Sequence, residues 1–74
     1  MLHHIRWETV FQTPSEAEAH VIAGLLETRG IMARVHQEPA GMTAGQLGDL
    51  MVLVDARDYE QALAFLREDA LEPR

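Results

Sequence analysis

Residues 13–31, TPSEAEAHVIAGLLETRGI, carry the clearest structural signal in this chain of 74 residues. The segment predicts an amphipathic helix over residues 14–29. Thr13 is a favourable N-cap residue, and Glu16 follows it by three positions, which is the spacing of a capping box. Pro14 suits the first helical position because its missing N–H is not needed there. Gly30 supplies the left-handed residue that ends many helices, so the next strand begins directly at Ile31.

One face of this predicted helix is apolar, and it requires a sheet to pack against. The apolar arc consists of Ala17, Val21, Ile22, Leu25 and Leu26, with Gly24 beside them. Glu16, His20, Ala23 and Glu27 fall on the opposite side of the helical wheel. The small residues Ala17 and Gly24 would allow a close approach to the sheet.

Three segments read as strands, at residues 4–12, 31–36 and 49–54. The first alternates Ile5, Trp7, Thr9 and Phe11 on one face with Arg6, Glu8 and Val10 on the other. This alternation leaves open which face meets the helices. The third is apolar without alternation, LMVLV, which is typical of a central strand covered on both faces.

A second helix is predicted over residues 56–69, with Asp55 as its N-cap. Its apolar stripe is formed by Tyr59, Ala62, Leu63, Leu66 and Ala70, and Phe65 lies off that stripe. Residues 37–48 contain Pro39, Gly41, Gly45 and Gly48, which break any regular period and indicate a loop.

The element order predicts a single α+β domain over residues 1–74, a ferredoxin-like βαββα arrangement. The three-stranded sheet has the order 1-3-2, and both helices cover one face. We expect strand three, placed in the centre, to run parallel to strand one and antiparallel to strand two. The opposite face then lacks a helix, although Met51 or Leu53, together with Trp7 or Val10, would project onto it.

An uncovered apolar face and a bare strand edge indicate association with another chain. A domain of this size also seldom gains more than roughly 3–5 kcal/mol from its core alone. We therefore expect a homo-oligomer, most simply a dimer, with self-association through Trp7, Met51 and Leu53.

The whole pattern resembles a small bacterial family of unknown function described as a putative prokaryotic signal-transducing protein, related to PII-type regulators. The resemblance rests on Val10-Phe11, Glu16-Ala17-Glu18, Leu25-Leu26-Glu27 before Gly30-Ile31, and Val52-Leu53-Val54. It implies a ferredoxin-like domain with a regulatory or interaction role and no established catalytic residues. In PII-type proteins the loop between the second and third strands contacts partners, and here that loop is residues 37–48.

Composition disfavours several classes of partner. The net charge is −6, with 12 acidic residues against 6 Arg and no Lys, so we expect neither nucleic acid nor an anionic membrane as a partner. The chain has no Cys, which excludes disulfides and thiolate metal ligands. No apolar run is long enough to span a bilayer and no secretory leader is recognisable, so we expect a cytoplasmic protein.

The candidate chemical groups have simpler structural interpretations. His3 and His4 are adjacent and point to opposite faces of a strand, and His20 and His36 stand alone, so we expect no metal site. Ser15, the only serine, serves the helix start, and Asp55 and Asp58 fit helix capping. No Gly-rich phosphate-binding motif precedes a helix. We therefore assign no catalytic residue and no cofactor.

The loop is the remaining candidate for function, because long loops in small domains are often binding elements. Its candidate contacts for a protein partner or an effector are Gln37, Glu38, Gly41, Met42, Gly45, Gln46 and Leu47. The leading hypothesis is a non-enzymatic, self-associating regulatory or protein-interaction module in signal transduction. A small-molecule sensor that binds a nucleotide or metabolite near this loop is the first alternative, and a small enzyme is the second.

Overall fold

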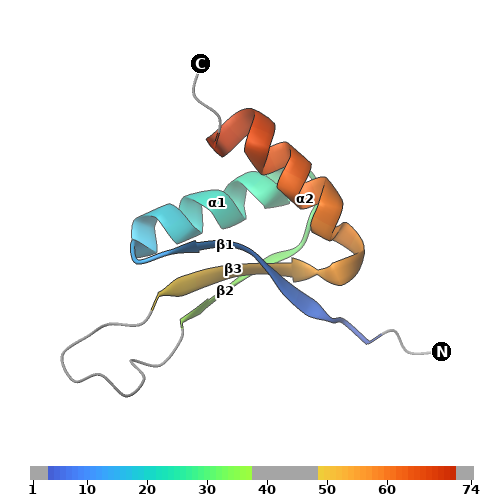
Figure 1. Ribbon diagram of the computed structural model, residues 1–74, viewed down its shortest axis with the longest axis horizontal. Coiled ribbons are helices and arrows are strands. Elements are labelled where there is room, and N and C mark those ends of the chain that lie inside the picture. The colour runs from blue at the N-terminus through green and yellow to red at the C-terminus, as the bar shows by residue number, and fades with distance from the viewer. Residues whose placement is uncertain (1–3, 38–48, 72–74) are drawn as a thin grey trace.

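A computed structural model describes residues 4–37 and 49–71 of the chain (Figure 1). Its elements are β1 (Trp7–Thr13), α1 (Glu16–Thr28), β2 (Ala33–Gln37), β3 (Leu50–Asp55) and α2 (Tyr59–Phe65). A 3-10 turn at Ala56–Asp58 precedes α2, and a π-helical segment at Leu66–Leu71 continues it. The order βαββα and the sheet order β1-β3-β2 confirm the predicted fold. Both helices lie over the same face of the sheet (Figure 1).

β3 is the central strand, as predicted, but the expected direction of β1 relative to it was wrong. β3 pairs antiparallel with both β1 and β2. The connection through α1 returns the chain to the same end of the sheet, so β1 and β2 run in one direction. The chain then reverses direction between β2 and β3, and β3 therefore runs antiparallel to both of its neighbours.

A bulge in β1 decides which side chains of this strand face the helices. The pairing register shifts between Thr9 and Phe11, so Thr9 pairs with Leu53 whereas Phe11 pairs with Val52. Because the bulge adds one residue, Val10 and Phe11 both turn toward the helix side, where Val10 is buried and Phe11 packs on the core. The simple alternation expected for this strand, with Phe11 on the face of Trp7, fails at this point.

The core lies between the sheet and the two helices. β3 contributes Leu50, Val52 and Val54, and these meet Leu26 of α1 and Leu66 beyond α2. The remaining buried core residues are Val10, Ala19, Ile22, Ala23, Ile31 and Ala62. Met51 and Leu53 are only half-buried, so β3 is covered by helices on one face rather than enclosed on both.

Helix α1 begins two residues later than predicted. Ser15, and not Thr13, is the N-cap, and its Oγ accepts a hydrogen bond from the backbone N–H of Glu18 at 3.1 Å. Thr13 ends β1, buried at 4% exposure. Its hydroxyl accepts from the Ser15 N–H at 3.1 Å and donates to Glu18 Oε1 at 2.6 Å. Glu16 takes no part in this cap and instead lies beside His20.

The buried stripe of α1 is rotated from the predicted arc toward Ala19 and Ala23, and the prediction that Ala23 lies on the polar side was wrong. Ala19, Ile22, Ala23 and Leu26 are buried, and Leu25 is half-buried. Ala17, Val21 and Gly24 are exposed, Val21 at 60%. The helix packs on the sheet through Ile22 and Leu26 with the small residues Ala19 and Ala23 beside them, so the far side of the predicted arc remains in solvent.

The C-terminal end of α1 is the predicted left-handed stop. Gly30 has φ +80, and its N–H donates to the Glu27 carbonyl at 3.0 Å. The N–H of Ile31 donates to the Leu26 carbonyl at 3.0 Å, which completes a Schellman motif. Ile31 is consequently 3% exposed and belongs to the core.

Asp55 starts the second helical segment, as expected. Its Oδ1 accepts from the backbone N–H of Arg57 at 3.1 Å. Along α2, Ala62 and Leu66 are fully buried, whereas Tyr59 and Leu63 are half-buried. Phe65, expected off the stripe, is also half-buried and packs against the core. The side chain of Ala70 lies outside the described part of the chain.

Candidate functional site

The face of the sheet opposite the helices, called here the open face, is formed by alternate residues of all three strands. Cross-strand partners share a face, so the pairing register assigns its members. They are Trp7, Thr9 and Gln12 of β1, Met51, Leu53 and Asp55 of β3, and Arg34 and His36 of β2. Among these, the predicted self-association residues Trp7, Met51 and Leu53 come together, whereas Val10 is buried on the helix side.

Side chains of the open face contact one another across the strands. The Arg34 guanidinium carbon lies 5.2 Å from the centroid of the Trp7 ring, a cation–π contact that spans β3. Thr9 Oγ1 donates to Met51 Sδ at 3.7 Å, and Gln12 Nε2 donates to Asp49 Oδ2 at 3.1 Å. These contacts link β1 to β2 and to the start of β3 across the open face.

Apolar surface continues beyond the strands at one end of the open face. Ile5 precedes Trp7 by two positions and is 40% exposed, and Met32 precedes Arg34 by two positions and is 58% exposed. The period of two along extended chain places both on the open-face side. Of the three exposed large hydrophobic residues in the described chain, only Val21 lies elsewhere, on α1. Clustering of this kind is typical of an association surface.

Both layers of the molecule carry charged side chains. The exposed charged residues of the described helical segments are Glu16, Glu18, Glu27, Glu60 and Glu68, together with Arg29, Arg57 and Arg67. On the open face, Arg34 and His36 are exposed, whereas Asp49 accepts the hydrogen bond from Gln12 and Asp55 is 8% exposed beside Arg57. The open face therefore combines apolar side chains with one arginine, one histidine and two aspartates, on a molecule of net charge −6.

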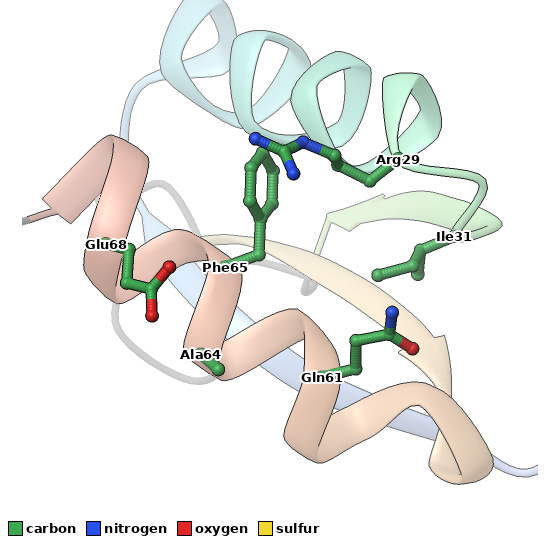
Figure 2. A pocket seen from close by; sticks show the side chains of 6 residues that line it. All are labelled: Arg29, Ile31, Gln61, Ala64, Phe65 and Glu68. Atoms are coloured by element: carbon green, nitrogen blue, oxygen red, sulfur yellow. The ribbon is translucent and has the colours of Figure 1, made fainter.

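A shallow groove lies between the end of α1 and α2 (Figure 2). It encloses about 320 Å³ and is lined by Arg29, Ile31, Gln61, Ala64, Phe65 and Glu68. The Arg29 guanidinium stacks on the Phe65 ring at 4.2 Å from its centroid. Ile31 and Phe65 supply apolar surface. Arg29 contributes a positive charge, Glu68 a negative charge and Gln61 a neutral amide. Sequence patterns did not point to these residues, because the groove joins positions that are far apart in the chain.

The predicted loop site lies largely outside the described residues. Gln37 is the exposed last residue of β2 and pairs with Leu50. Glu38, Gly41, Met42, Gly45, Gln46 and Leu47 fall outside the part that the structure describes. The groove is at the other end of α1 from the point where β2 ends and β3 begins (Figure 1).

The described histidines are separate from one another. His4, His20 and His36 are exposed, and His3 lies outside the described residues. His20 Nε2 is 3.9 Å from Glu16 Oε2, the surface pair expected from their spacing. Within residues 4–37 and 49–71, no three His, Cys, Asp or Glu side chains gather as a metal site. In the same ranges, no helix is long and apolar enough to cross a membrane.

Comparison with known proteins identifies one family. The model of a family described as "Putative prokaryotic signal transducing protein" matches residues 7–69, which is most of the chain. Searches of curated proteins and of solved structures give no significant match. The matched range includes every strand and helix that forms the open face and the groove.

Proposed function

The chain belongs to the family described as "Putative prokaryotic signal transducing protein", and we propose that it is a non-enzymatic regulatory module that acts by protein interaction. We also propose that it self-associates through the open face. The family description gives the general role in signal transduction. The mode of action is inferred from the surfaces of the molecule.

The single observation that carries this proposal is the apolar surface on the uncovered side of the sheet. Trp7, Met51 and Leu53 are half-buried there, and Ile5 and Met32 extend the surface. Each of them would lose exposed apolar area in contact with a second chain, and burial of apolar area drives association.

The side chains with potential reactivity are used to hold the fold. The Ser15 hydroxyl caps α1 by accepting the Glu18 N–H. The Asp55 carboxylate accepts the Arg57 N–H, and its Oδ2 lies 3.6 Å from Arg57 Nε. A hydroxyl and a carboxylate in these structural roles favour an interaction module over an enzyme.

Analytical ultracentrifugation tests self-association. At micromolar concentration we expect a dimer, and Leu53→Arg should convert it to a monomer because a cation replaces an apolar contact. Val21→Arg is the matched control, since Val21 is equally apolar but lies on α1, and it should remain a dimer. A wild-type protein that sediments as a monomer at these concentrations would overturn the proposal of self-association.

The groove between α1 and α2 supports a second candidate function, the sensing of a small molecule. Its volume of about 320 Å³ is near the lower end of ligand-sized pockets. Polar groups of both charges beside the Phe65 ring would suit an amphiphilic metabolite. Under the sequence hypothesis, the effector would instead bind near residues 37–48.

A thermal-shift screen against nucleotides and metabolites separates these sites. A ligand of the groove should lose its stabilising effect in Ala64→Leu, which fills the groove with a larger side chain. Ala17→Leu is the control, because Ala17 is exposed at the opposite end of α1. A ligand of the loop should lose its effect when residues 41–46 are shortened and keep it in Ala64→Leu. If no compound shifts the transition, the sensor function is excluded for the compounds screened.

A further inference from the structure

We propose that the groove between α1 and α2 binds a free α-amino acid with an apolar side chain. This inference rests on the second candidate function, the sensing of a small molecule, and names the chemical class of the effector. It gives each group of the lining a role. Arg29 holds the carboxylate, Glu68 holds the ammonium group, and Phe65 with Ile31 contacts the side chain.

The base of the groove is apolar. The turn that ends α1 brings Ile31 into the core at 3% exposure, two residues after Arg29. Phe65, the last residue of α2, is half-buried and packs on the same core. Ala64 is exposed, and its short side chain leaves room between its longer neighbours. An apolar ligand group would therefore contact the Phe65 ring and Ile31 at the base.

Polar groups reach the groove from both helical segments. Gln61, Ala64, Phe65 and Glu68 recur at the spacing that places side chains on one side of a helix. In Figure 2 Gln61 and Glu68 project on either side of Ala64, and the Arg29 side chain extends from the end of α1 over the Phe65 ring. A ligand in the groove is thus within reach of groups from two separate elements.

The helix that carries this side of the groove changes its geometry within the lining. Phe65 ends the α-helical part, and a π-helical segment begins at Leu66 and includes Glu68. The wider π turn is rare in helices and is frequent at functional sites. Its position between two residues of the lining is a second indication that the groove is a site.

The stack on Phe65 orients the guanidinium of Arg29. The guanidinium carbon lies 4.2 Å from the centroid of the ring, so the contact uses the flat face of the cation. The N–H donors of a guanidinium lie in its plane and form a fork that matches the two oxygens of a carboxylate. A cation that is already held in place loses less freedom when it binds a ligand.

The charges of the lining favour a ligand that carries one charge of each sign. Among the described residues, Arg29 and Glu68 are the charged members of the lining. A nucleotide would bring several negative charges to one guanidinium beside a carboxylate, on a molecule of net charge −6. A simple amine would use Glu68 alone, and a simple carboxylic acid would use Arg29 alone. An α-amino acid uses both, and the Gln61 amide can donate to or accept from either of its charged groups.

The size of the groove also suits a small zwitterion. Its volume of about 320 Å³ is near the lower end of the range for drug-sized ligands, and a single amino acid is smaller than such a ligand. The terminus of a peptide offers a related chemistry, but it carries only one of the two charges. The free amino acid is therefore the better match.

Leucine and two of its analogues test the need for both charges. The amide NMR spectrum of the protein should show saturable shifts at Ile31 and Phe65 when leucine is added at millimolar concentration. Leucinamide lacks the carboxylate and isocaproate lacks the ammonium group, so each should bind about tenfold or more weakly. An analogue that binds as tightly as leucine would overturn the zwitterion. Leucine, isoleucine and phenylalanine that all fail to bind would overturn the proposal as a whole.

Charge-neutral variants assign the two ends of the ligand. Glu68→Gln should weaken leucine and leucinamide by about tenfold or more and leave isocaproate no weaker, because only the ammonium group loses its partner. Glu60→Gln is the matched control, since Glu60 is an exposed carboxylate of α2 outside the lining, and it should stay within about twofold of the wild-type affinity. Equal effects of Glu68→Gln on all three compounds, or no effect on leucine, would contradict the assigned role.

Arg29 is tested in the same way. Arg29→Gln should weaken leucine and isocaproate and spare leucinamide, and Arg67→Gln, at an exposed arginine outside the lining, is its control. Circular dichroism shows that each variant is folded, and the exposed Glu68 provides a result that does not depend on the Arg29 stack. Loss of all three compounds in folded Arg29→Gln would contradict its role as the carboxylate partner.

The outcomes separate the ligand class from the functions proposed above. If amino acids do not bind and another metabolite stabilises the wild type but not Ala64→Leu, the ligand class is overturned and sensing by the groove stands. If leucine binds equally well to Ala64→Leu, the groove is not its site. Self-association through the open face is measured by sedimentation and is independent of these results.

Discussion

At the scale of single residues, the start of α1 shows how neighbouring polar groups divide their roles. Thr13 and Ser15 are both suitable caps, and the sequence alone favours Thr13 because Glu16 follows it at the spacing of a capping box. In the structure Ser15 caps the helix, and Glu18 is the acidic residue three positions on. Thr13 supports this cap by accepting from the Ser15 N–H and donating to Glu18. The preference for Thr13 fails because this residue is needed as the buried end of β1.

Ser15→Ala should lower the free energy of unfolding by about 1 kcal/mol, because the Glu18 N–H would lose its acceptor. Urea denaturation followed by circular dichroism measures the change. Glu16→Gln is the control, and its effect should stay within about 0.5 kcal/mol because Glu16 is exposed and absent from the cap. The opposite ranking of the two variants would show that Thr13 and Glu16 form the working cap.

Gly24 and Gly30 should respond in opposite directions to the same substitution. Gly30→Ala should lower the free energy of unfolding by about 1–2 kcal/mol, since φ +80 is unfavourable for alanine although a Cβ would meet no atom within 4 Å. Gly24→Ala should raise it by roughly 1 kcal/mol, because this position is inside α1, exposed, and also free of neighbours within 4 Å. Thermal denaturation of both variants checks the pair. A destabilised Gly24→Ala would mean that another chain packs closely there.

At the scale of elements, the bulge in β1 and the orientation of α1 determine which apolar residues enter the core. The bulge turns both Val10 and Phe11 toward the helices and leaves Trp7 and Thr9 on the open face. Helix α1 contacts the sheet along one narrow stripe, so Val21 is left in solvent. Two valines that look similar in sequence therefore have different environments.

Val10→Ala should lower the free energy of unfolding by about 2 kcal/mol, because Val10 is 8% exposed and its truncation leaves a cavity beside the core. Val21→Ala should change it by no more than about 0.5 kcal/mol, because Val21 is 60% exposed and alanine favours the helix. Equilibrium unfolding in urea compares the two. Measurement below the concentration of dimerisation removes any contribution from a second subunit. Equal losses in both variants would contradict the structure of α1 described above.

At the scale of the whole molecule, the two layers have different properties. The helix layer exposes charged side chains of both signs and covers one side of the core, whereas the sheet layer exposes Arg34 and His36 beside half-buried apolar side chains. A core shared by three strands and two helices in 74 residues provides limited stability on its own. Dimerisation through the open face would bury further the apolar side chains that the single chain leaves half-buried.

The midpoint of thermal unfolding should therefore increase with protein concentration. Mass action stabilises a folded dimer as concentration increases, and we expect a rise of about 3–5 °C for each tenfold increase. Differential scanning calorimetry from low to high micromolar concentration measures it. Leu53→Arg should show a lower midpoint that does not depend on concentration. A constant midpoint in the wild-type protein would agree with a monomer and contradict self-association.

The sequence by itself determined the element order, the central place of β3, the left-handed end of α1 at Gly30 and the family. These features depend on local patterns, since hydrophobic periods, caps and glycines act over a few residues. It also identified Trp7, Met51 and Leu53 as candidates for one surface, but it left Val10 as an alternative. The bulge that removes Val10 from this surface has no signal in the residue types themselves.

Only the tertiary structure decided the direction of β3 against β1, the cap at Ser15, the exposed position of Val21 and the groove between the end of α1 and α2. It also placed Arg34 across β3 from Thr9 and its guanidinium over the Trp7 ring. Each of these features joins segments that are distant in the chain. Their geometry follows from how the sheet and the helices pack together, and one-dimensional patterns carry no information about that packing.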